Sequence, residues 1–199
     1  MPLDDYLIQT GIAKTLNRQT KNFAVALPSL EKVFAPYSEF TRKTWDALKQ
    51  DGLDSGDVFE LMIATLLYHS GISVFYRHAT IKFLEHTDFD LLLWDEQNAA
   101  PVLLQCTSTL RERFRLADLE SFRSKSFYPN AKTYLLTMDY RDTARLTDYK
   151  FDSLDRLIYA GDRALDELFE YLRSRTFSEP PGGALLMFKS RGLEVTQQR

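Results

Sequence analysis

The chain has 199 residues, of which 44% are hydrophobic and 27% charged, and its formal net charge is -3 at pH 7. This length and hydrophobic content suit one sizeable core, so a single domain is predicted over residues 1–199. The single cysteine excludes an intrachain disulfide framework and a cysteine-rich zinc site. With no long apolar run and no signal-like start, the sequence predicts a cytoplasmic protein without a membrane partner.

Charge is unevenly distributed along the middle of the chain. Residues 51–100 contain nine acidic and two basic side chains, whereas residues 101–150 contain nine basic and six acidic ones. An acidic segment followed by a basic one is what a cation site beside a phosphate-binding face requires. Ordinary solvated surface is the alternative interpretation.

The first 50 residues are predicted to form a helical cap over a sheet. Their apolar residues Phe23, Leu27, Leu30 and Phe34 are spaced as in helices. A clearer helix follows this cap and continues to the next glycine.

That second helix is predicted between Asp54 and Gly71. Asp54 or Ser55 caps its free amides, and Gly71 ends it. Glu60 is the only acid in its apolar stretch, and a buried carboxylate needs a cation or a hydrogen-bond donor. A metal ion would satisfy Glu60, and so would Arg77 or Lys82.

Three strand candidates come next and form the centre of the predicted fold. They occupy residues 72–84, 88–95 and 101–109, with a turn at 96–101 between the last two. The short connections predict an antiparallel meander.

The remaining elements alternate between helix and strand, which predicts an α/β fold. A helix at 110–122 leads to a strand at 131–138, and a fifth strand is predicted at 154–161. Residues 163–175 pattern as a helix, and 184–188 as an edge strand. The apolar face of that last helix comprises Leu165, Leu168, Phe169 and Leu172. The domain thus divides into the cap, a core over residues 51–140, and a C-terminal part over 141–199 with a strand, a helix and a tail.

Polar side chains converge where two of these strands meet. Asp90 precedes the apolar run Leu91–Trp94, and Gln105 and Thr107 alternate along the returning strand. Residues at a spacing of two share a face of a sheet, and cross-strand partners lie within about 5 Å. We therefore expect these three side chains to lie together.

The order of elements resembles the PD-(D/E)xK nuclease superfamily, with a variant D…QxT signature. The resemblance covers roughly residues 55–137: a helix with an acid, a three-stranded meander, a helix and a strand. The stretch QCTSTLRERFRLADLE is similar to that of certain type II restriction endonucleases. The resemblance implies a restriction endonuclease-like core, Mg²⁺ or Mn²⁺ as cofactor, hydrolysis of DNA phosphodiester bonds, and a role in restriction or defence.

Site residues follow from the same resemblance, position by position. Asp90 matches the metal-bridging aspartate, Gln105 the second acid, Thr107 the lysine, and Glu60 the accessory acid of the first helix. The resemblance implies catalytic roles for these four residues, and metal binding by Asp90, Gln105, Glu60 and the carbonyl of Cys106.

Two of these positions depart from the family pattern. Gln105 retains an oxygen ligand but carries no charge, and Thr107 cannot be a cation. Substitutes for the missing lysine are Lys82, Arg111, Arg113 or Lys125, while Asp88 and Glu120 are further candidate acids. The basic residues expected to contact DNA phosphates are Arg111, Arg113, Arg115, Arg123 and Lys125.

Structural interpretations stand beside these functional ones. An aspartate at the entry to a strand, such as Asp90, often accepts the backbone N–H groups of a turn. Glutamine and threonine, as at Gln105 and Thr107, are common hydrogen-bonding residues on half-exposed strands. Of the three histidines, which lack zinc-binding spacing, His86 is the candidate acid or base.

Three functional hypotheses result. The first is a DNA endonuclease, expected to act as a homodimer through its N-terminal helices. The second is an inactive nuclease fold that serves as a DNA-binding or assembly subunit of a larger complex, which Thr107 favours. The third is an interaction protein without a nucleic-acid role.

Overall fold

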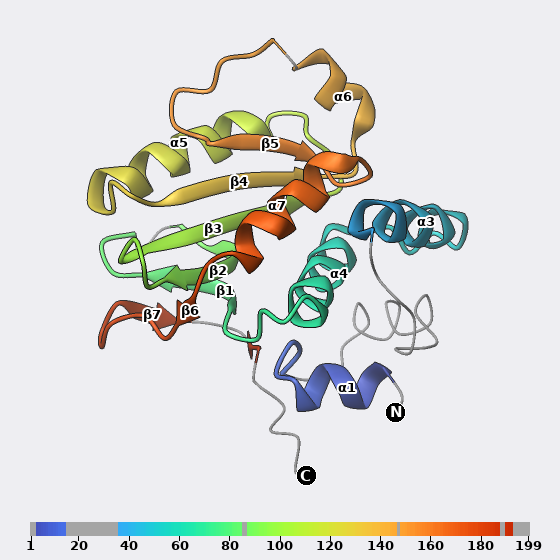
Figure 1. Cartoon of the computed structure of the whole chain (residues 1–199). Helices are drawn as coiled ribbons and strands as arrows, with labels where there is room; N and C mark the ends of the chain where they lie inside the picture. Colours follow the sequence, from blue (N-terminus) through green and yellow to red (C-terminus); the bar gives the residue numbers. More distant parts are fainter. Residues whose placement is uncertain (1–2, 15–35, 85–86, 147, 188–189, 193–199) are drawn as a thin grey trace.

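The computed structural model describes residues 3–14, 36–84, 87–146, 148–187 and 190–192, and has a mixed α/β architecture (Figure 1). Two helices of the predicted cap are described, α1 (Leu3–Gln9) and α3 (Tyr37–Gln50). The apolar positions Phe23, Leu27, Leu30 and Phe34 lie outside the described residues. Within the described ranges, no helix is long and apolar enough to cross a membrane.

The sheet has the strand order β5-β4-β3-β2-β1-β7. β1 pairs antiparallel with β2 and β2 with β3, which confirms the predicted meander. β3 pairs parallel with β4, because helix α5 (Arg113–Phe127) crosses over between them, and β4 pairs parallel with β5. The strands are β1 (Tyr76–Ile81), β2 (Phe89–Asp95), β3 (Ala100–Thr107), β4 (Lys132–Thr137) and β5 (Arg156–Tyr159).

Three short strands complete the sheet. β7 (Leu185–Met187) lies within the predicted C-terminal strand and pairs antiparallel with β1. β6 (Phe177–Ser178) pairs with β2 and β8 (Ser190–Arg191) pairs with β1; neither was predicted. Two-residue strands carry too little periodicity for a sequence pattern to indicate them.

Helices cover both faces of the sheet, so the central strands are apolar on both sides. Leu91 and Leu93 belong to the core cluster that α4 (Gly56–His69) and α7 (Arg163–Arg173) complete, whereas Leu92 belongs to a cluster on the opposite face. On that second face, Ala117 of α5 packs with Leu135 of β4. Figure 1 shows α7 crossing in front of the sheet and α5 lying behind it.

Helix α4 (Gly56–His69) begins and ends where its capping residues predict. The side chain of Ser55 accepts a hydrogen bond from the Val58 N–H, and Gly71, with a φ of +90°, ends the helix. All its residues from Val58 to Leu67 are buried. Glu60 therefore lies inside the core.

The helix predicted at 110–122 is displaced along the chain. α5 spans Arg113–Phe127, because Leu110 is fully buried and Arg111 adopts a φ of +33°, so the chain turns before the helix begins. Helix α6 (Tyr140–Arg145) was not predicted; its six residues are capped by Asp139.

Helix α7 (Arg163–Arg173) confirms the prediction for its segment, with all four expected apolar residues buried. α3 packs on α7 and α4, and its Trp45 and Leu48 are buried in the core.

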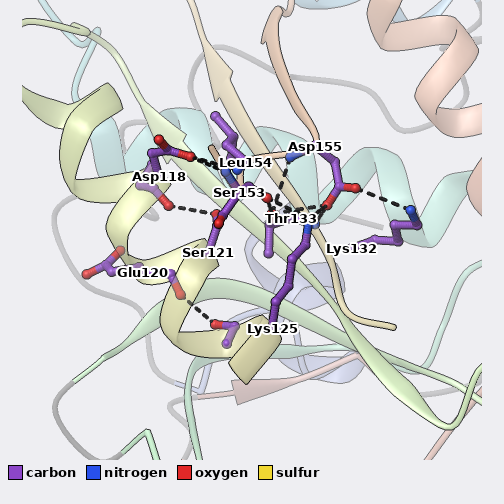
Figure 2. Close-up of polar contacts among 11 residues, drawn as sticks. Asp118, Glu120, Ser121, Lys125, Lys132, Thr133, Ser153, Leu154 and Asp155 are labelled. Carbon is purple, nitrogen blue, oxygen red and sulfur yellow. Dashed lines mark hydrogen bonds and ion pairs between the residues drawn. The ribbon is translucent and has the colours of Figure 1, made fainter. Parts of the chain in front are cut away.

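Side chains of α5 fix this helix to the loop before β5 (Figure 2). The Asp118 carboxylate accepts the backbone N–H groups of residues 152–154 at 2.8 to 3.1 Å. About two turns later, Lys125 donates to the Ser153 carbonyl and pairs with Asp155 at 2.8 Å. Asp155 in turn accepts the N–H of Thr133 at the start of β4. The polar contacts of α5 thus position two parallel strands.

We expect Asp118→Ala to destabilise the protein by about 1–3 kcal/mol, because the backbone N–H groups of the loop lose their acceptor. Burial raises the pKa of Asp118, but the hydrogen bonds from residues 154, 153 and 152 outweigh burial and lower the pKa overall. A lowered pKa means that this stabilisation is present at neutral pH and is lost as the pH falls below about 4. Urea unfolding at pH 7 and at pH 3 measures both effects.

Glu170→Ala, at an exposed position on α7, is the matched control and should change stability by less than about 0.5 kcal/mol. Equal urea midpoints for Asp118→Ala and Glu170→Ala at pH 7 would contradict the role given to Asp118.

Candidate functional site

A cavity of about 380 Å³ opens where β2 begins and β3 ends. It is lined by residues of α4, β2, β3 and α5, together with the loop that follows β3. Residues expected from the sequence make up much of this lining: Glu60, Asp88, Asp90, Gln105, Cys106, Thr107, Arg113 and Glu120.

The strand register explains why Asp90 and Gln105 meet. Leu91 pairs with Leu104, so Asp90 and Gln105 are the next residues at the same end of the hairpin. The Cys106 N–H donates to Oδ2 of Asp90 at 2.6 Å, and the Gln105 amide donates to Glu120 of α5. The hydroxyl of Thr107 donates to the Thr109 carbonyl at 2.7 Å. Backbone groups thus hold Asp90 and Thr107, and Glu120 holds Gln105, at the mouth of the hairpin.

Glu60 is a buried carboxylate with a partner on each oxygen. Its exposed fraction is 2%; Nε of Arg77 lies 2.5 Å from one oxygen, and Nε2 of His78 lies 2.9 Å from the other. Burial raises the pKa of Glu60, but the hydrogen bond from His78 and the charge of Arg77 outweigh burial and lower the pKa overall. Glu60 is therefore ionised at neutral pH, and Arg77 is the structural partner that it needs.

His78 was not among the site residues expected from the sequence. Neighbouring side chains of a strand point to opposite faces, yet Arg77 and His78 both contact Glu60. A φ of +48° at His78 accounts for this, since the left-handed backbone turns the side chain away from its regular direction. Such a conformation costs roughly 1–3 kcal/mol in a non-glycine residue.

The register places His78 opposite Asp90, between the pairs Arg77–Leu91 and Ala79–Phe89. Glu60, His78 and Asp90 each offer a ligand atom, and these atoms lie within 4.8 Å of one another. His86, the expected acid or base, lies outside the described residues. The spacing of the histidines in the sequence did not indicate His78 as a site residue. The pairing of β1 with β2 places it beside Asp90.

Burial controls the protonation of the carboxyl groups in this cavity. It raises the pKa of Asp90 to about 6; the nearby charge of Glu60 adds to this, while the Cys106 N–H, His78 and Arg113 oppose it. Burial also raises the pKa of Glu120, although the hydrogen bond from Gln105 acts the other way. A cation bound in the cavity would favour the charged forms of these carboxyl groups and so lower their pKa values.

Of the expected basic residues, Arg113 lines the cavity. Lys125 does not: its ammonium group is bound to the Ser153 carbonyl and pairs with Asp155 (Figure 2). Lys82 lies over the ring of Phe83, outside the cavity lining.

The other arginines expected to contact phosphates are exposed and also lie outside the lining; they are Arg111, just before α5, and Arg115 and Arg123 on it.

Comparisons of the sequence and structure with models of protein families, with curated proteins and with solved structures find no match. The roles of the cavity residues therefore rest on their geometry and chemistry.

We expect Arg77→Met to destabilise the protein by about 3–5 kcal/mol, because it leaves Glu60 charged in the core with one partner removed. Adding Glu60→Gln to this variant should recover part of the loss. Urea unfolding of the two single variants and the double variant measures the coupling between the residues.

Arg156→Met is the control, since Arg156 pairs with Glu167 on the surface and should contribute less than about 1 kcal/mol. A loss in Arg77→Met no larger than that of Arg156→Met would contradict a stabilising role for the buried pair.

Asp90→Asn should stabilise the folded protein above pH 6 by roughly 1–3 kcal/mol. A raised pKa means that ionising Asp90 costs free energy in the folded state; the cost is absent below about pH 4 and complete above the folded pKa. The asparagine carbonyl still accepts the Cys106 N–H. Thermal melting of both proteins at pH 4 and pH 8 tests this: a difference between them that is the same at both pH values would refute it.

Proposed function

We propose that this protein is a metal-dependent endonuclease of the PD-(D/E)xK type that hydrolyses DNA phosphodiester bonds at the cavity of Asp90. The observation that carries the proposal is the meeting, in one cavity, of an acid from α4, an acid at the start of β2 and a polar residue of β3. The order α4, antiparallel β1–β2–β3, α5 and β4 supports it, because the resemblance implies this same order.

The cavity residues fit a divalent cation. Asp90, Gln105 and Glu60 supply oxygen atoms, which Mg²⁺ and Mn²⁺ prefer. Asp90 and Gln105 would hold the ion directly. Glu60 would contribute mainly its charge, because Arg77 and His78 already bind its two oxygens.

A divalent cation bound here would lower the pKa of a water molecule and neutralise charge on the phosphate. The protein's own residues would do the rest. Arg113 lines the cavity and carries a permanent positive charge. Its N–H groups would donate hydrogen bonds to a phosphate oxygen. Glu120, with its raised pKa and its hydrogen bond to Gln105, would accept the proton of the attacking water. Arg113 thus takes the electrostatic role of the missing lysine.

Cleavage of supercoiled plasmid in Mg²⁺ and in Mn²⁺ tests this function. We expect nicking by the wild-type protein, loss of at least about a hundredfold in rate for Asp90→Asn, and a loss of roughly ten- to a hundredfold for Arg113→Ala. Glu170→Ala is the control and should retain full activity.

Cleavage that persists in Asp90→Asn would show that the activity lies elsewhere. No cleavage of several unrelated DNAs in either metal would refute the proposal.

A second candidate function is binding of DNA, or assembly into a complex, without hydrolysis. Two observations favour it: Thr107 carries no charge, and both oxygens of Glu60 are bound by Arg77 and His78. DNA binding without Asp90-dependent cleavage distinguishes this candidate from an endonuclease. If the protein dimerises, the apolar side of α3 is not the interface, since Trp45 and Leu48 are buried in their own chain.

A further inference from the structure

A second cavity, of about 600 Å³, adjoins the site cavity. The two have Ser108 and Thr109 in common, in the loop after β3. The second cavity lies beyond the ends of the parallel strands β3, β4 and β5, where α/β proteins commonly bind ligands. Its volume falls in the range typical of ligand pockets, about 300–1,000 Å³.

Aromatic side chains form one side of this cavity and are held in place. Tyr140 is 64% exposed, and its ring contacts that of Tyr159 edge to face, with centroids 5.3 Å apart. Tyr159 in turn lies against Gly161, where an added Cβ would come within 2.6 Å of the Tyr159 ring. A fixed ring thus supports an exposed one, and the exposed face of Tyr140 is open to a flat ligand.

The charges of the second cavity nearly balance. Lys49 and Arg141 lie in its lining with Asp46 and Asp54, and the carboxylate of Asp139 accepts two backbone N–H groups. This mixture does not favour an anion. It suits a neutral ligand that offers both hydrogen-bond donors and acceptors along its edge.

We propose that the second cavity binds an unpaired nucleobase of the DNA strand whose phosphate lies in the site cavity, an inference that rests on the proposed function. The base would stack on Tyr140 and place its edge toward Asp46 and Lys49. Bases of a continuous duplex are paired and stacked on one another, so a base reaches this cavity only from a single strand, a gap or a flipped position. Flipping a base out of a duplex costs free energy, so the preferred substrate is DNA with a single-stranded segment.

Binding to labelled oligonucleotides in Ca²⁺, followed by fluorescence anisotropy, tests the proposal with the full-length protein. Three DNAs of the same sequence are compared: a single strand, a perfect duplex, and a duplex with a one-nucleotide gap opposite an unpaired 2-aminopurine. We expect tighter binding to the single strand and the gapped duplex than to the perfect duplex, and quenching of 2-aminopurine as it stacks on Tyr140.

Variants of Tyr140 identify the contact. Tyr140→Ala should weaken binding to the single-stranded and gapped DNAs roughly 5- to 150-fold, the range for loss of one stacked base, and should abolish the quenching. Tyr140→Phe keeps the ring and should bind as the wild type does. Phe122→Ala removes an equally exposed aromatic residue outside both cavities and should have no effect.

Equal affinity for gapped and perfect duplexes, or unchanged binding by Tyr140→Ala, would overturn the base-binding cavity even if the plasmid is cleaved. Tyr140-dependent binding without Asp90-dependent cleavage would support the base-binding cavity and refute hydrolysis. No binding to any of the three DNAs would overturn both.

Discussion

A carboxylate inside an apolar helix requires charged or hydrogen-bonding partners wherever that helix packs, and Glu60 imposes this requirement on the whole domain. Arg77 of β1 meets it, and the same guanidinium donates to the carbonyl of Ile12 near the N-terminus. Three distant segments are thus joined at one buried ion pair. Replacing such a pair by apolar residues often costs nothing, whereas removing one partner is expensive. Glu60 therefore ties the packing of α4 to the presence of a basic residue on β1.

Local signals in the sequence were sufficient for most of the fold. Ser55 and Gly71 bound α4 because capping depends on a few adjacent residues, and the apolar strands of the meander are joined by short connections. The start of α5 was misplaced, since Leu110 is buried in a cluster with Leu135 and Leu154, and its N–H donates to Asp139, 29 residues away. Long-range contacts of this kind have no signature in a local window.

The candidate site was predictable where it depends on strand alternation. Asp90, Gln105 and Thr107 line one cavity because they share one end of a hairpin, and that end is readable from their spacing. His78 was not predictable, since its direction depends on a left-handed backbone in the middle of a strand. The pairing of Lys125 with Asp155 likewise follows from how α5 packs, whereas its charge alone suggested a phosphate contact.

The connectivity of the sheet also has a consequence for the order in which the chain folds. The hairpin of β2 and β3 pairs residues as few as 5 positions apart, at Asp95 and Ala100, whereas β1 pairs with β7 across more than 100 positions, at Thr80 and Met187. Closing a long loop costs more conformational entropy than closing a short one, so contacts between near neighbours form first. We therefore expect the hairpin that carries Asp90 and Gln105 to form early in folding. The C-terminal strand, which closes the far edge of the sheet, is added to a structure in which this part of the site has already formed.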